Sequence, residues 1–473
     1  MADLEQLSRR ELLAVVVAQA ELIEQQAARI EELVGQVAEL QRRLGQNSRN
    51  SSLPPSSDRF TAPRPQRRKR SGRKPGKQPG APGANLELVA DPDEVVDHVP
   101  GACSGCGAGL AGADSAGVIV RQVHDIPLVG VRVIEHRLHR RACGCGTVTT
   151  ATAPAGVDAP ACYGPNLRAI AVYLVVFQHV PVERAARLVA DLCGAAVSTG
   201  WVSAQVARTA DALADVEKLI KTLITLAAVI GVDETSVNVA GDKQWLHVAR
   251  TDLLTAYRLH PSRGRAAVHE FGVLPTYPGT VMHDALTVYD AYPATHALCG
   301  AHIIRELTAA AEAHPDAEWP VQARSALAGL AELAQQARDH GLDRIPLGQA
   351  AEPLRLFRDA VRVGLAEHRR APGRKQSKTR NLLERLRDRE PEILRFTTDL
   401  AVPFTNNGSE RDLRPVKTQL KISGCHRAAT GATAWLRIRG YISTVRKHGG
   451  DILTALRDAI TGNPWQPPQH APT

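Results

Sequence analysis

Three acidic residues far apart in the chain, Asp233, Asp284 and Glu410, have the chemistry needed to hold divalent metal ions. Asp233 follows the apolar run LAAVIGV, and Asp284 follows a second one, GTVMH. Two ions about 3.5 to 4 Å apart clamp the attacking and leaving oxygens of an in-line phosphoryl displacement, and few carboxylates suffice to hold them. Because Mg²⁺ prefers oxygen ligands and keeps several waters, these residues predict a site for two Mg²⁺ or Mn²⁺ ions.

Glu410 lies in a polar, asparagine-rich stretch, PFTNNGSERDLRPVK, that opens into a predicted helix. Leu413, Val416 and Leu420 recur there at helical spacing. A carboxylate in a first helical turn is also favoured by capping and by the macrodipole, so Glu410 alone carries no functional meaning. It gains one only if the fold brings it to the two aspartates.

Three neighbouring acids compete with these candidates: Glu234, Asp290 and Asp412. Successive strand residues point to opposite faces, so only one of Asp233 and Glu234 is expected to enter the site. Asp290 is expected in a loop or helix, and Asp412 lies half a turn from Glu410. As isolated residues, such acids are most often solvated charges.

The elements that must position the aspartates read as strands. LAAVIGVDETSVNV, QWLHVARTD and TAYRLHPSR predict a three-stranded meander, GRAAVHEFG a helix, and GTVMHDA a fourth strand that ends on Asp284. A carboxylate in the first strand of a meander and another just past the fourth strand is the layout of an RNase H-like fold. We therefore expect both side chains at one edge of the sheet. The long interval before Glu410 predicts amphipathic helices around a basic loop, GRKQSKTR.

The N-terminal part reads as a long helix followed by a linker. Val16, Ile23, Ile30 and Val37 fall every seventh residue, with leucines at companion positions, which favours a parallel two-stranded coiled coil and hence a dimer or higher oligomer. The alternative is a single amphipathic helix packed on its own chain. The Pro- and Gly-rich segment that follows predicts a disordered linker that grips the DNA backbone or serves only as a solvated spacer. Its basic residues proposed to bind DNA are Arg67, Arg68, Lys69, Arg70, Arg73 and Lys74.

Two close cysteine pairs, Cys103 with Cys106 and Cys143 with Cys145, flank the strand-like stretch RQVHDIPLVGVRVIEHRLHR. Tetrahedral zinc takes two thiolates from each of two knuckles, so the pairs predict a structural zinc ribbon. The second pair is tighter than the usual spacing. His136 or His139 as a substitute ligand, or loss of the metal, are therefore alternatives. The remaining cysteines show no such pairing and are expected to be buried thiols: Cys162, Cys193, Cys299 and Cys425.

The segment VERAARLVADLCGAAVSTGWVSAQVART predicts a helix-turn-helix, with Gly194 near the turn and Ser198 or Thr199 capping the second helix. That helix would enter a major groove, although helical hairpins of this kind also occur as plain packing modules.

Composition sets the class of protein. With 473 residues, a formal net charge of +9 and 44% hydrophobic residues, the chain is expected to be soluble and to form several domains. It carries no apolar run of membrane-spanning length and no signal peptide, so a cytoplasmic, nucleoid-associated protein with reduced cysteines and no membrane contact is expected. The basic excess points to nucleic acid.

Several blocks occur in the order found in the insertion sequence sixty-six family of DDE transposases, which the chain resembles over nearly its whole length. These are NSRNSSLPPSSD, KRSGRKPGKQPGAPG, GVDETSV, HPSRG, HDALTVYDAY with HALCGAHIIREL, and PFTNNGSERDLRPVKTQLKISG with YISTVRKHG. The resemblance implies that Asp233, Asp284 and Glu410 are the catalytic triad, with a helical insertion before the third member. Ser409 departs from the alanine that relatives often have, and the tight second cysteine pair departs from the usual zinc pattern.

The resemblance also implies the reaction. The metal-bound carboxylates activate water to cleave the terminal inverted repeats, and the freed 3′ hydroxyls attack target DNA, with accessory proteins of the same element as further partners. Cys299 and His302, one turn apart, imply a supporting role beside the site, by metal binding or by packing and a hydrogen bond. Arg263, Arg411, Arg414 and Lys417 are placed to bind DNA phosphates, although a solvated helix face explains the last three equally well. The alternatives are a non-catalytic DNA-binding descendant and an RNase H-like nuclease or resolvase.

The predicted architecture is multidomain, with an α/β RNase H-like catalytic core and a helical insertion. The predicted parts are a coiled coil (1–46), a basic disordered linker (47–85), a zinc-ribbon-like domain (86–155), a helical, helix-turn-helix-like DNA-binding domain (156–222), the first part of the core (223–312), the helical insertion (313–396), the second part of the core with Glu410 (397–462) and a disordered tail (463–473).

Overall fold

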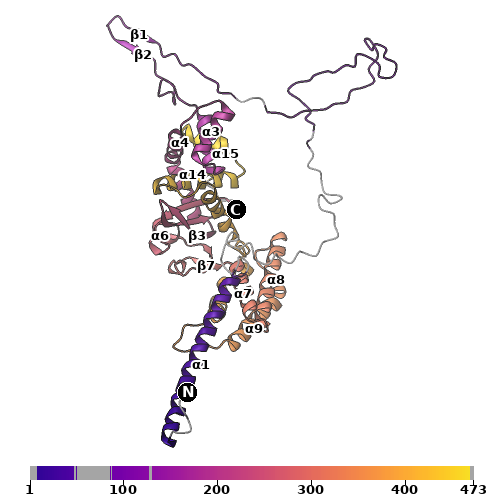
Figure 1. Ribbon diagram of the computed structural model, residues 1–473. Helices are drawn as coiled ribbons and strands as arrows, with labels where there is room; N and C mark the ends of the chain where they lie inside the picture. The colour runs from indigo at the N-terminus through magenta and orange to yellow at the C-terminus, as the bar shows by residue number, and fades with distance from the viewer. Residues whose placement is uncertain (1–7, 47–49, 51–85, 87, 127–129, 469–473) are drawn as a thin grey trace. The chain divides into compact units, whose positions relative to one another are not determined.

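A computed structural model describes residues 8–46, 50, 86, 88–126 and 130–468 (Figure 1). The chain divides into two compact units, one made of residues 1–62 and 133–473 and the other of residues 63–132. Apart from residue 50, the predicted basic linker lies outside the described residues, and so do its six proposed DNA-binding residues. None of the helices in the described part of the chain combines the length and apolar character needed to cross a membrane.

The central element is a five-stranded mixed sheet with the order β5-β4-β3-β6-β7. Its strands are β3 (Val229–Val239), β4 (Asp242–Arg250), β5 (Thr255–His260), β6 (Thr280–His283) and β7 (Thr295–Leu298). The first three form the predicted antiparallel meander, and β6 and β7 continue the sheet in parallel. Ala240 and Gly241 join β3 to β4 with positive φ angles of 55° and 94°, as a tight two-residue hairpin turn requires.

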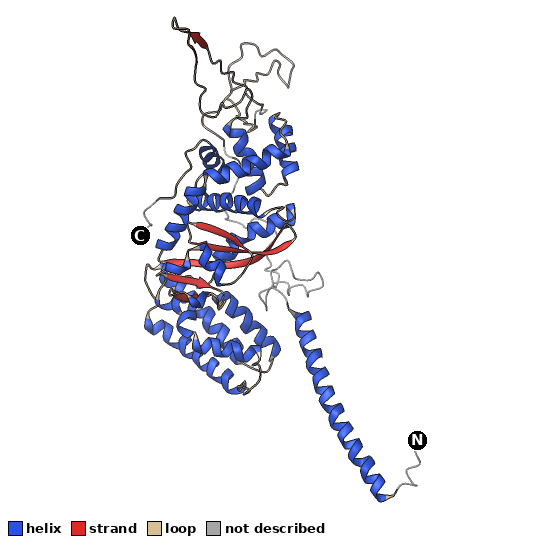
Figure 2. Cartoon of the chain, turned by 90° about the vertical axis from the view of Figure 1, so that its left-hand side faces the viewer, coloured by secondary structure: helices blue, strands red, loops and turns tan. Residues whose placement is uncertain are grey.

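Helices lie against the sheet (Figure 2), and its apolar side chains are buried beneath them. The helices α13 and α14 pack on β3, β4 and β5, and α6 contacts β4. This core includes Ile230, Leu246, Val416 and Tyr441, all almost fully buried. The bounds are α6 (Arg265–Phe271), α13 (Asn407–Ser423), α14 (Ala429–Lys447) and α15 (Ile452–Ile460), with 3-10 turns at Leu274–Thr276 and Tyr289–Ala291.

The long interval between β7 and α13 is helical, as predicted, and has a core of its own. Trp319, Leu327 and Phe357 are buried there together with Met282 and Leu298 from β6 and β7. The helices are α7 (Gly300–Ala313), α8 (Trp319–Asp339), α9 (Leu347–Glu367), α10 (Lys378–Asp388), α11 (Glu390–Ile393) and α12 (Arg395–Thr398).

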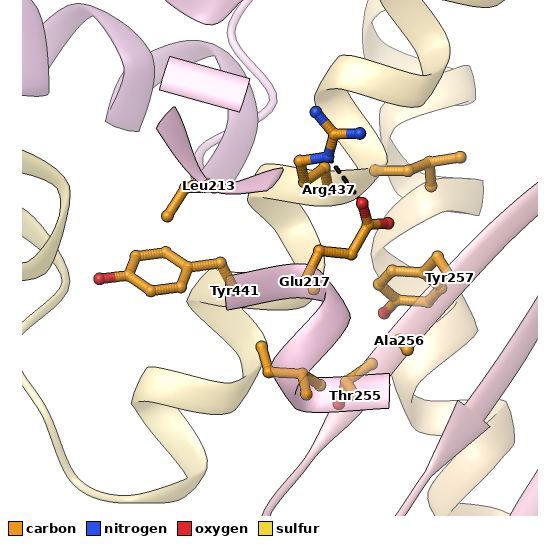
Figure 3. Close-up of a pocket in the computed structure, with 10 residues that line it drawn as sticks. Leu213, Glu217, Thr255, Ala256, Tyr257, Arg437 and Tyr441 are labelled. Carbon is orange, nitrogen blue, oxygen red and sulfur yellow. Dashed lines mark hydrogen bonds and ion pairs between the residues drawn. The ribbon is translucent and has the colours of Figure 1, made fainter. Parts of the chain in front are cut away.

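The predicted helical segment before the sheet is also present. It contains α2 (Pro165–Val172), a π-helical turn (Tyr173–Phe177), α3 (Val182–Cys193), α4 (Thr199–Ala212) and α5 (Ala214–Leu226). Gly194 ends α3 in the left-handed conformation, and the Ser198 hydroxyl caps α4 by accepting the Trp201 N–H. A small pocket at the junction with α14 is lined in part by Arg437 and Glu217, which form an ion pair of 2.7 Å (Figure 3).

Near the N-terminus, α1 spans Arg9–Gly45, as predicted. Val16, Ile23, Ile30 and Val37, which form the predicted heptad seam, are each more than half exposed in the single chain.

Three predictions are wrong. Cys162 and Cys425, predicted to be buried thiols, are exposed. The stretch between the cysteine pairs forms no strand before β1 (Arg140–Ala142), which pairs with β2 (Val148–Thr150), because its described residues find no neighbouring strand to pair with. The tail is packed as far as Trp465, whose ring contacts Tyr441 and His448.

Candidate active site

The parallel pairing of β3 and β6 brings the two aspartates together. Gly231 is level with Met282 in this ladder, so continuing the register by two residues places Asp233 level with Asp284. Both are partly buried. Backbone N–H groups orient both carboxylates: that of Glu234 donates to Asp233 Oδ1 at 2.8 Å, and that of Leu286 donates to Asp284 Oδ1 at 3.1 Å.

A cluster of three carboxylates results. One oxygen from each of Asp233, Glu234 and Asp284 lies within 4.8 Å of the other two. Burial raises the pKa of Asp233 well above its usual value, and the charges of Glu234 and Asp284 raise it further. A bound cation would relieve this repulsion, and hard oxygen donors are what Mg²⁺ and Mn²⁺ bind. The residues therefore fit a divalent metal site.

Glu234 differs from the other two because its oxygens already have strong donors. Arg263 donates to Oε1 from Nε at 2.9 Å and from Nη2 at 2.7 Å, and the Tyr289 hydroxyl donates to Oε2 at 2.6 Å. The Arg263 guanidinium also stacks 5.0 Å from the Trp245 ring. Asp233 and Glu234 have different partners, as strand alternation predicts, although one carboxylate oxygen of each lies within 4.8 Å of the other.

Glu410 lies in the first turn of α13 and is not a member of this mutual cluster. Its Oε1 is 3.4 Å from Arg305 Nη2 and 3.9 Å from His302 Nε2, both on α7. It is nonetheless near enough for its charge to contribute to the raised pKa of Asp233. The Glu410 carboxylate thus contacts α7 and stands outside the group formed by Asp233, Glu234 and Asp284.

Asn406 fixes the start of α13 against β3. Its side-chain N–H donates to the Val232 carbonyl at 2.7 Å, its Oδ1 accepts from the Ser409 hydroxyl at 2.7 Å, and its backbone N–H donates to Cys299 Sγ at 3.1 Å. A Cβ at Gly231 would lie 2.6 Å from the Ser409 oxygen, so this close approach requires glycine there. Cys299 and His302 thus contact different parts of the site: Cys299 the start of α13, and His302 the Glu410 carboxylate.

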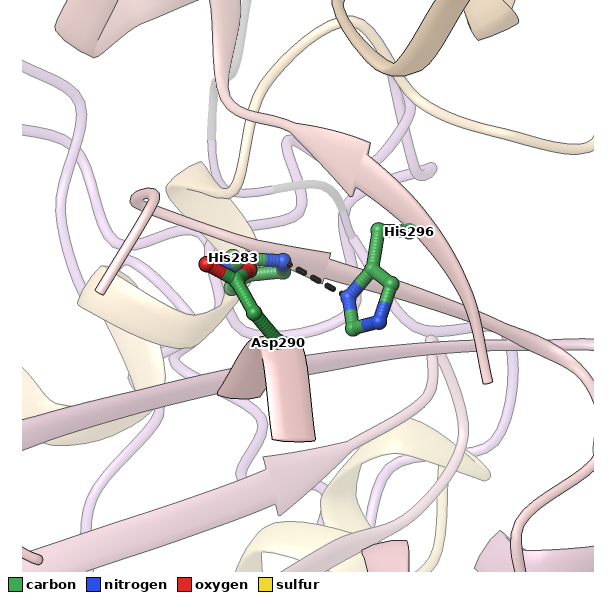
Figure 4. Close-up of side chains that lie close together, drawn as sticks. All are labelled: His283, Asp290 and His296. Atoms are coloured by element: carbon green, nitrogen blue, oxygen red, sulfur yellow. Dashed lines mark hydrogen bonds between the residues drawn. The ribbon is translucent and has the colours of Figure 1, made fainter. Parts of the chain in front are cut away.

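A second group, His283, Asp290 and His296, also brings metal-ligating atoms together (Figure 4). The Ala285 N–H donates to His283 Nδ1 at 3.2 Å, so the proton of the neutral ring lies on Nε2, which donates to His296 Nδ1 at 3.0 Å. A protonated nitrogen cannot bind a metal. Burial, with His296 and Arg389 nearby, lowers the pKa of His283 to about 3, which keeps the ring neutral.

This group is therefore a hydrogen-bonded chain that supports the turn after Asp284. His296 Nε2 completes the chain by donating to the Tyr292 carbonyl at 3.3 Å. The turn needs support because Ala285 has a positive φ of 70°. Asp290 forms an ion pair of 2.8 Å with Arg389.

Asp412, the other competing acid, has a structural role. Its Oδ2 accepts from Lys447 Nζ at 2.7 Å and from Arg250 Nε at 3.2 Å, and its side chain is 11% exposed. These bonds tie α13 to α14 and β4, because the two cations belong to those elements.

Four basic residues of α13 face solvent along one side of the helix: Arg411, Arg414, Lys417 and Lys421. None of the ion pairs found among the described residues involves them. Arg263, by contrast, forms an ion pair with Glu234. The predicted second helix of the helix-turn-helix, α4, exposes Thr199, Ser203, Arg208 and Asp211 and buries Gln205.

Each cysteine pair forms a knuckle closed by its own backbone. In the first, Cys103 donates to the Ala108 carbonyl at 2.8 Å and accepts from the Gly107 N–H at 2.9 Å. In the second, Cys143 donates to Thr147 at 2.8 Å and accepts from Gly146 at 2.9 Å. The second knuckle thus repeats the same two bonds in a turn one residue shorter, which accommodates the tighter spacing.

One thiol of each knuckle, that of Cys103 and that of Cys145, has a lowered pKa. Backbone N–H groups of Cys106 and Gly105 lower the pKa of Cys103. The hydroxyl and N–H of Thr147 lower the pKa of Cys145 from 9.0 to about 7. Because zinc binds thiolate rather than thiol, a lowered pKa favours zinc binding by these two cysteines.

Sequence reasoning missed Arg305, Tyr289 and the anchoring role of Asn406. Arg305 follows His302 by one helical turn, so helical periodicity alone would have placed both on the face of α7 toward Glu410. No sequence signal connects Tyr289 to Glu234, because that contact depends on the position of a 3-10 turn.

Comparison with known families agrees with this geometry. A family model described as transposase IS66 family matches residues 160–434. The zinc-finger binding domain of transposase IS66 matches residues 100–146, which supports a zinc site, and a family of unknown function matches residues 4–87. A search of curated proteins found no match.

Proposed function

The chain belongs to the IS66 family of transposases, and on that premise we propose that it cleaves the ends of an insertion sequence and joins the freed 3′ hydroxyls to target DNA. The observation that carries the proposal is the meeting of Asp233, within β3, and Asp284, directly after the parallel strand β6. The strand order β5-β4-β3-β6-β7 supports an RNase H-like core.

Asp233, Asp284 and Glu410 are the residues that would hold two Mg²⁺ or Mn²⁺ ions. When bound, such ions activate a water or a 3′ hydroxyl and neutralise charge at the phosphate. Glu234 follows Asp233 in β3. Its hydrogen bonds with Arg263 and Tyr289 would keep this part of the strand in position beside the ions. Arg305 and His302 hold the Glu410 carboxylate beside the site, from which it reaches the ions by a side-chain movement.

DNA binding in this proposal uses the exposed cations of α13, which begin directly after Glu410. Arg411, Arg414 and Lys417 would bind phosphates near the scissile bond; their exposure along one side of the helix that carries the third carboxylate supports this. The linker cations between 67 and 74 would add contacts that do not depend on base sequence.

The proposed active form is a dimer or higher oligomer. The seam of α1 leaves Val16, Ile23, Ile30 and Val37 exposed in a single chain, and pairing with a second copy of the helix would bury them. Accessory proteins of the same element are further proposed partners.

A cleavage and joining assay tests the proposal. Full-length protein would be incubated with duplex DNA carrying the sequences that flank the gene, a target plasmid and Mg²⁺ or Mn²⁺. Asp233→Asn, Asp284→Asn and Glu410→Gln should each lower both reactions about a thousandfold or more, because a metal ligand contributes several kcal/mol. DNA binding should stay largely intact.

Asp290→Asn is the matched control, since Asp290 is an exposed neighbour committed to Arg389. Near-full activity of any triad variant would show that its residue is misassigned. Failure of the unaltered protein with all accessory factors present would favour a non-catalytic DNA-binding descendant. Cleavage of branched or hybrid substrates without joining would favour a nuclease or resolvase.

A further inference from the structure

The loop between α9 and α10, residues 368–377, carries a concentration of positive charge that the active site does not use. Its sequence, HRRAPGRKQS, contains four arginine or lysine residues and no acid. Arg369, Arg370, Arg374 and Lys375 are all exposed, as is Lys378 in the first turn of α10. Glu384 partly compensates the group through a contact of 3.5 Å with Arg370.

The loop is held in shape by its own hydrogen bonds. The Gln376 side chain accepts the Ala371 N–H at 2.9 Å and donates to the carbonyls of Ala371 at 2.6 Å and Arg374 at 2.8 Å. Gly373 supplies the positive φ of 70° that the turn needs. The backbone that carries Arg374 and Lys375 is therefore ordered before any partner binds.

Both ends of the loop are fixed by Arg380. Its Nη1 donates to the carbonyls of Leu365 at 3.0 Å and His368 at 2.9 Å, which closes the C-terminal end of α9, and its Nε pairs with Glu384 at 2.9 Å. Ser377 caps α10 by accepting the Arg380 N–H at 3.0 Å. Glu384 is thus paired more closely with the structural Arg380 than with the exposed Arg370. The exposed cations of the loop therefore have little negative charge near them.

A fixed, exposed and uncompensated group of cations matches a polyanion of regular charge spacing. Duplex DNA presents such a surface, because each strand carries one phosphate for about every 3.4 Å of the helix axis. Because the backbone is already ordered, binding would cost mainly the freedom of the side chains.

We propose that the 368–377 loop is a DNA-backbone contact separate from α13, in which Arg369, Arg374, Lys375 and Lys378 bind phosphates of duplex DNA. This rests on the proposed function, since it assigns the loop to the same DNA substrate. It places part of the DNA footprint on the helical insertion rather than on the sheet and α13.

The test compares two full-length variants with the same change in charge. The loop variant is R369Q/R374Q/K375Q/K378Q. The control variant is R344Q/R355Q/R362Q/R387Q, in which four exposed arginines of the same helical region are each paired with a nearby aspartate. The probe is a 30-base-pair duplex, and its dissociation constant is measured over a range of KCl concentrations.

Each phosphate contact that is lost lowers the slope of log K against log salt by about 0.9. We expect the loop variant to lose about 2 to 4 from the slope and to bind at least tenfold more weakly at 0.1 M salt. The control should change the slope by less than about 0.5. The double variant R369K/R374K should keep the slope, because counterion release depends on charge.

Equal slopes for the loop and control variants, with unchanged circular dichroism and melting temperature, would overturn the proposal. An unchanged DNA slope with lost binding of poly-glutamate would also overturn it and point to an acidic protein partner. The outcome is separate from that of the catalytic proposal, because the binding assay omits divalent metal and measures no cleavage.

Discussion

The two candidate metal sites of this chain are built in opposite ways. The carboxylate site joins β3, the end of β6 and α13, so its residues are far apart in sequence and depend on buried packing. Each cysteine knuckle is made by a few consecutive residues, is mostly exposed and is closed by two backbone hydrogen bonds. Burial and repulsion raise the pKa of Asp233, whereas hydrogen bonds lower the pKa of Cys145.

The difference shows what each site requires from the fold. The carboxylates are charged groups held together against their repulsion, so the energy that brings them together comes from the packing of the sheet and helices. The thiols need only their own turn to favour the thiolate. Substitutions far from the carboxylates should therefore impair that site, and substitutions near the thiols should act only locally.

Asn406→Ala should have the largest effect of the variants that test this contrast. It leaves the Val232 carbonyl and the Ser409 hydroxyl without their partner in a buried place, at about 1–3 kcal/mol each. We expect the free energy of unfolding to fall by about 2–4 kcal/mol and cleavage to fall about a hundredfold, since the start of α13 positions Glu410. Thermal unfolding and the cleavage assay measure the two effects.

The adjacent residue provides the control. Asn407 is exposed, so Asn407→Ala should leave the melting temperature within about a degree of the unaltered protein, as surface substitutions usually do. An equal loss of cleavage in both variants, with neither melting temperature changed, would mean that the asparagines act through DNA rather than through the fold.

Much of the fold and of the candidate site could be predicted because both depend on local patterns. Apolar alternation predicts β3 to β5, and the positions of Asp233 and Asp284 relative to the strands follow from it. The contacts that complete the site could not be predicted in this way. Those of Asn406 with Val232 and of Tyr289 with Glu234 depend on how distant elements dock. The strand expected between the cysteine pairs failed for a related reason: alternation marks a segment able to form a strand, but a strand also needs a partner.

Arg305→Gln should have a smaller effect, and a favourable one: it should lower the Mn²⁺ concentration that cleavage requires. The carboxylate of Glu410 has to leave the Arg305 guanidinium before it can serve as a ligand, so removing the cation removes a competitor. The pair is about one-quarter to one-third exposed, so it contributes at most about 1 kcal/mol, a factor of about five. We expect the Mn²⁺ concentration for half-maximal cleavage to fall by up to about fivefold.

Arg305→Lys keeps the positive charge and should leave the Mn²⁺ requirement nearly unchanged. A higher Mn²⁺ requirement in Arg305→Gln would mean that Arg305 orients Glu410 toward the aspartates rather than competing with them.

Thr147→Val should have the smallest and most local effect, and it tests the knuckle side of the contrast. The Thr147 hydroxyl lies 3.3 Å from Cys145 Sγ and is the largest cause of the lowered pKa. Its loss should move the pKa of Cys145 from about 7 toward 9.0. Since only the thiolate reacts with iodoacetamide, alkylation of Cys145 in metal-free protein should rise through pH 7 in the unaltered chain and at higher pH in the variant. Peptide mass spectrometry resolves the individual cysteines. Thr149→Val, in β2, is the control. An equal shift in the pKa of Cys145 in both variants, or a shift in the pKa of Cys103 as well, would mean that the thiol pKa of a knuckle is not determined by its own turn.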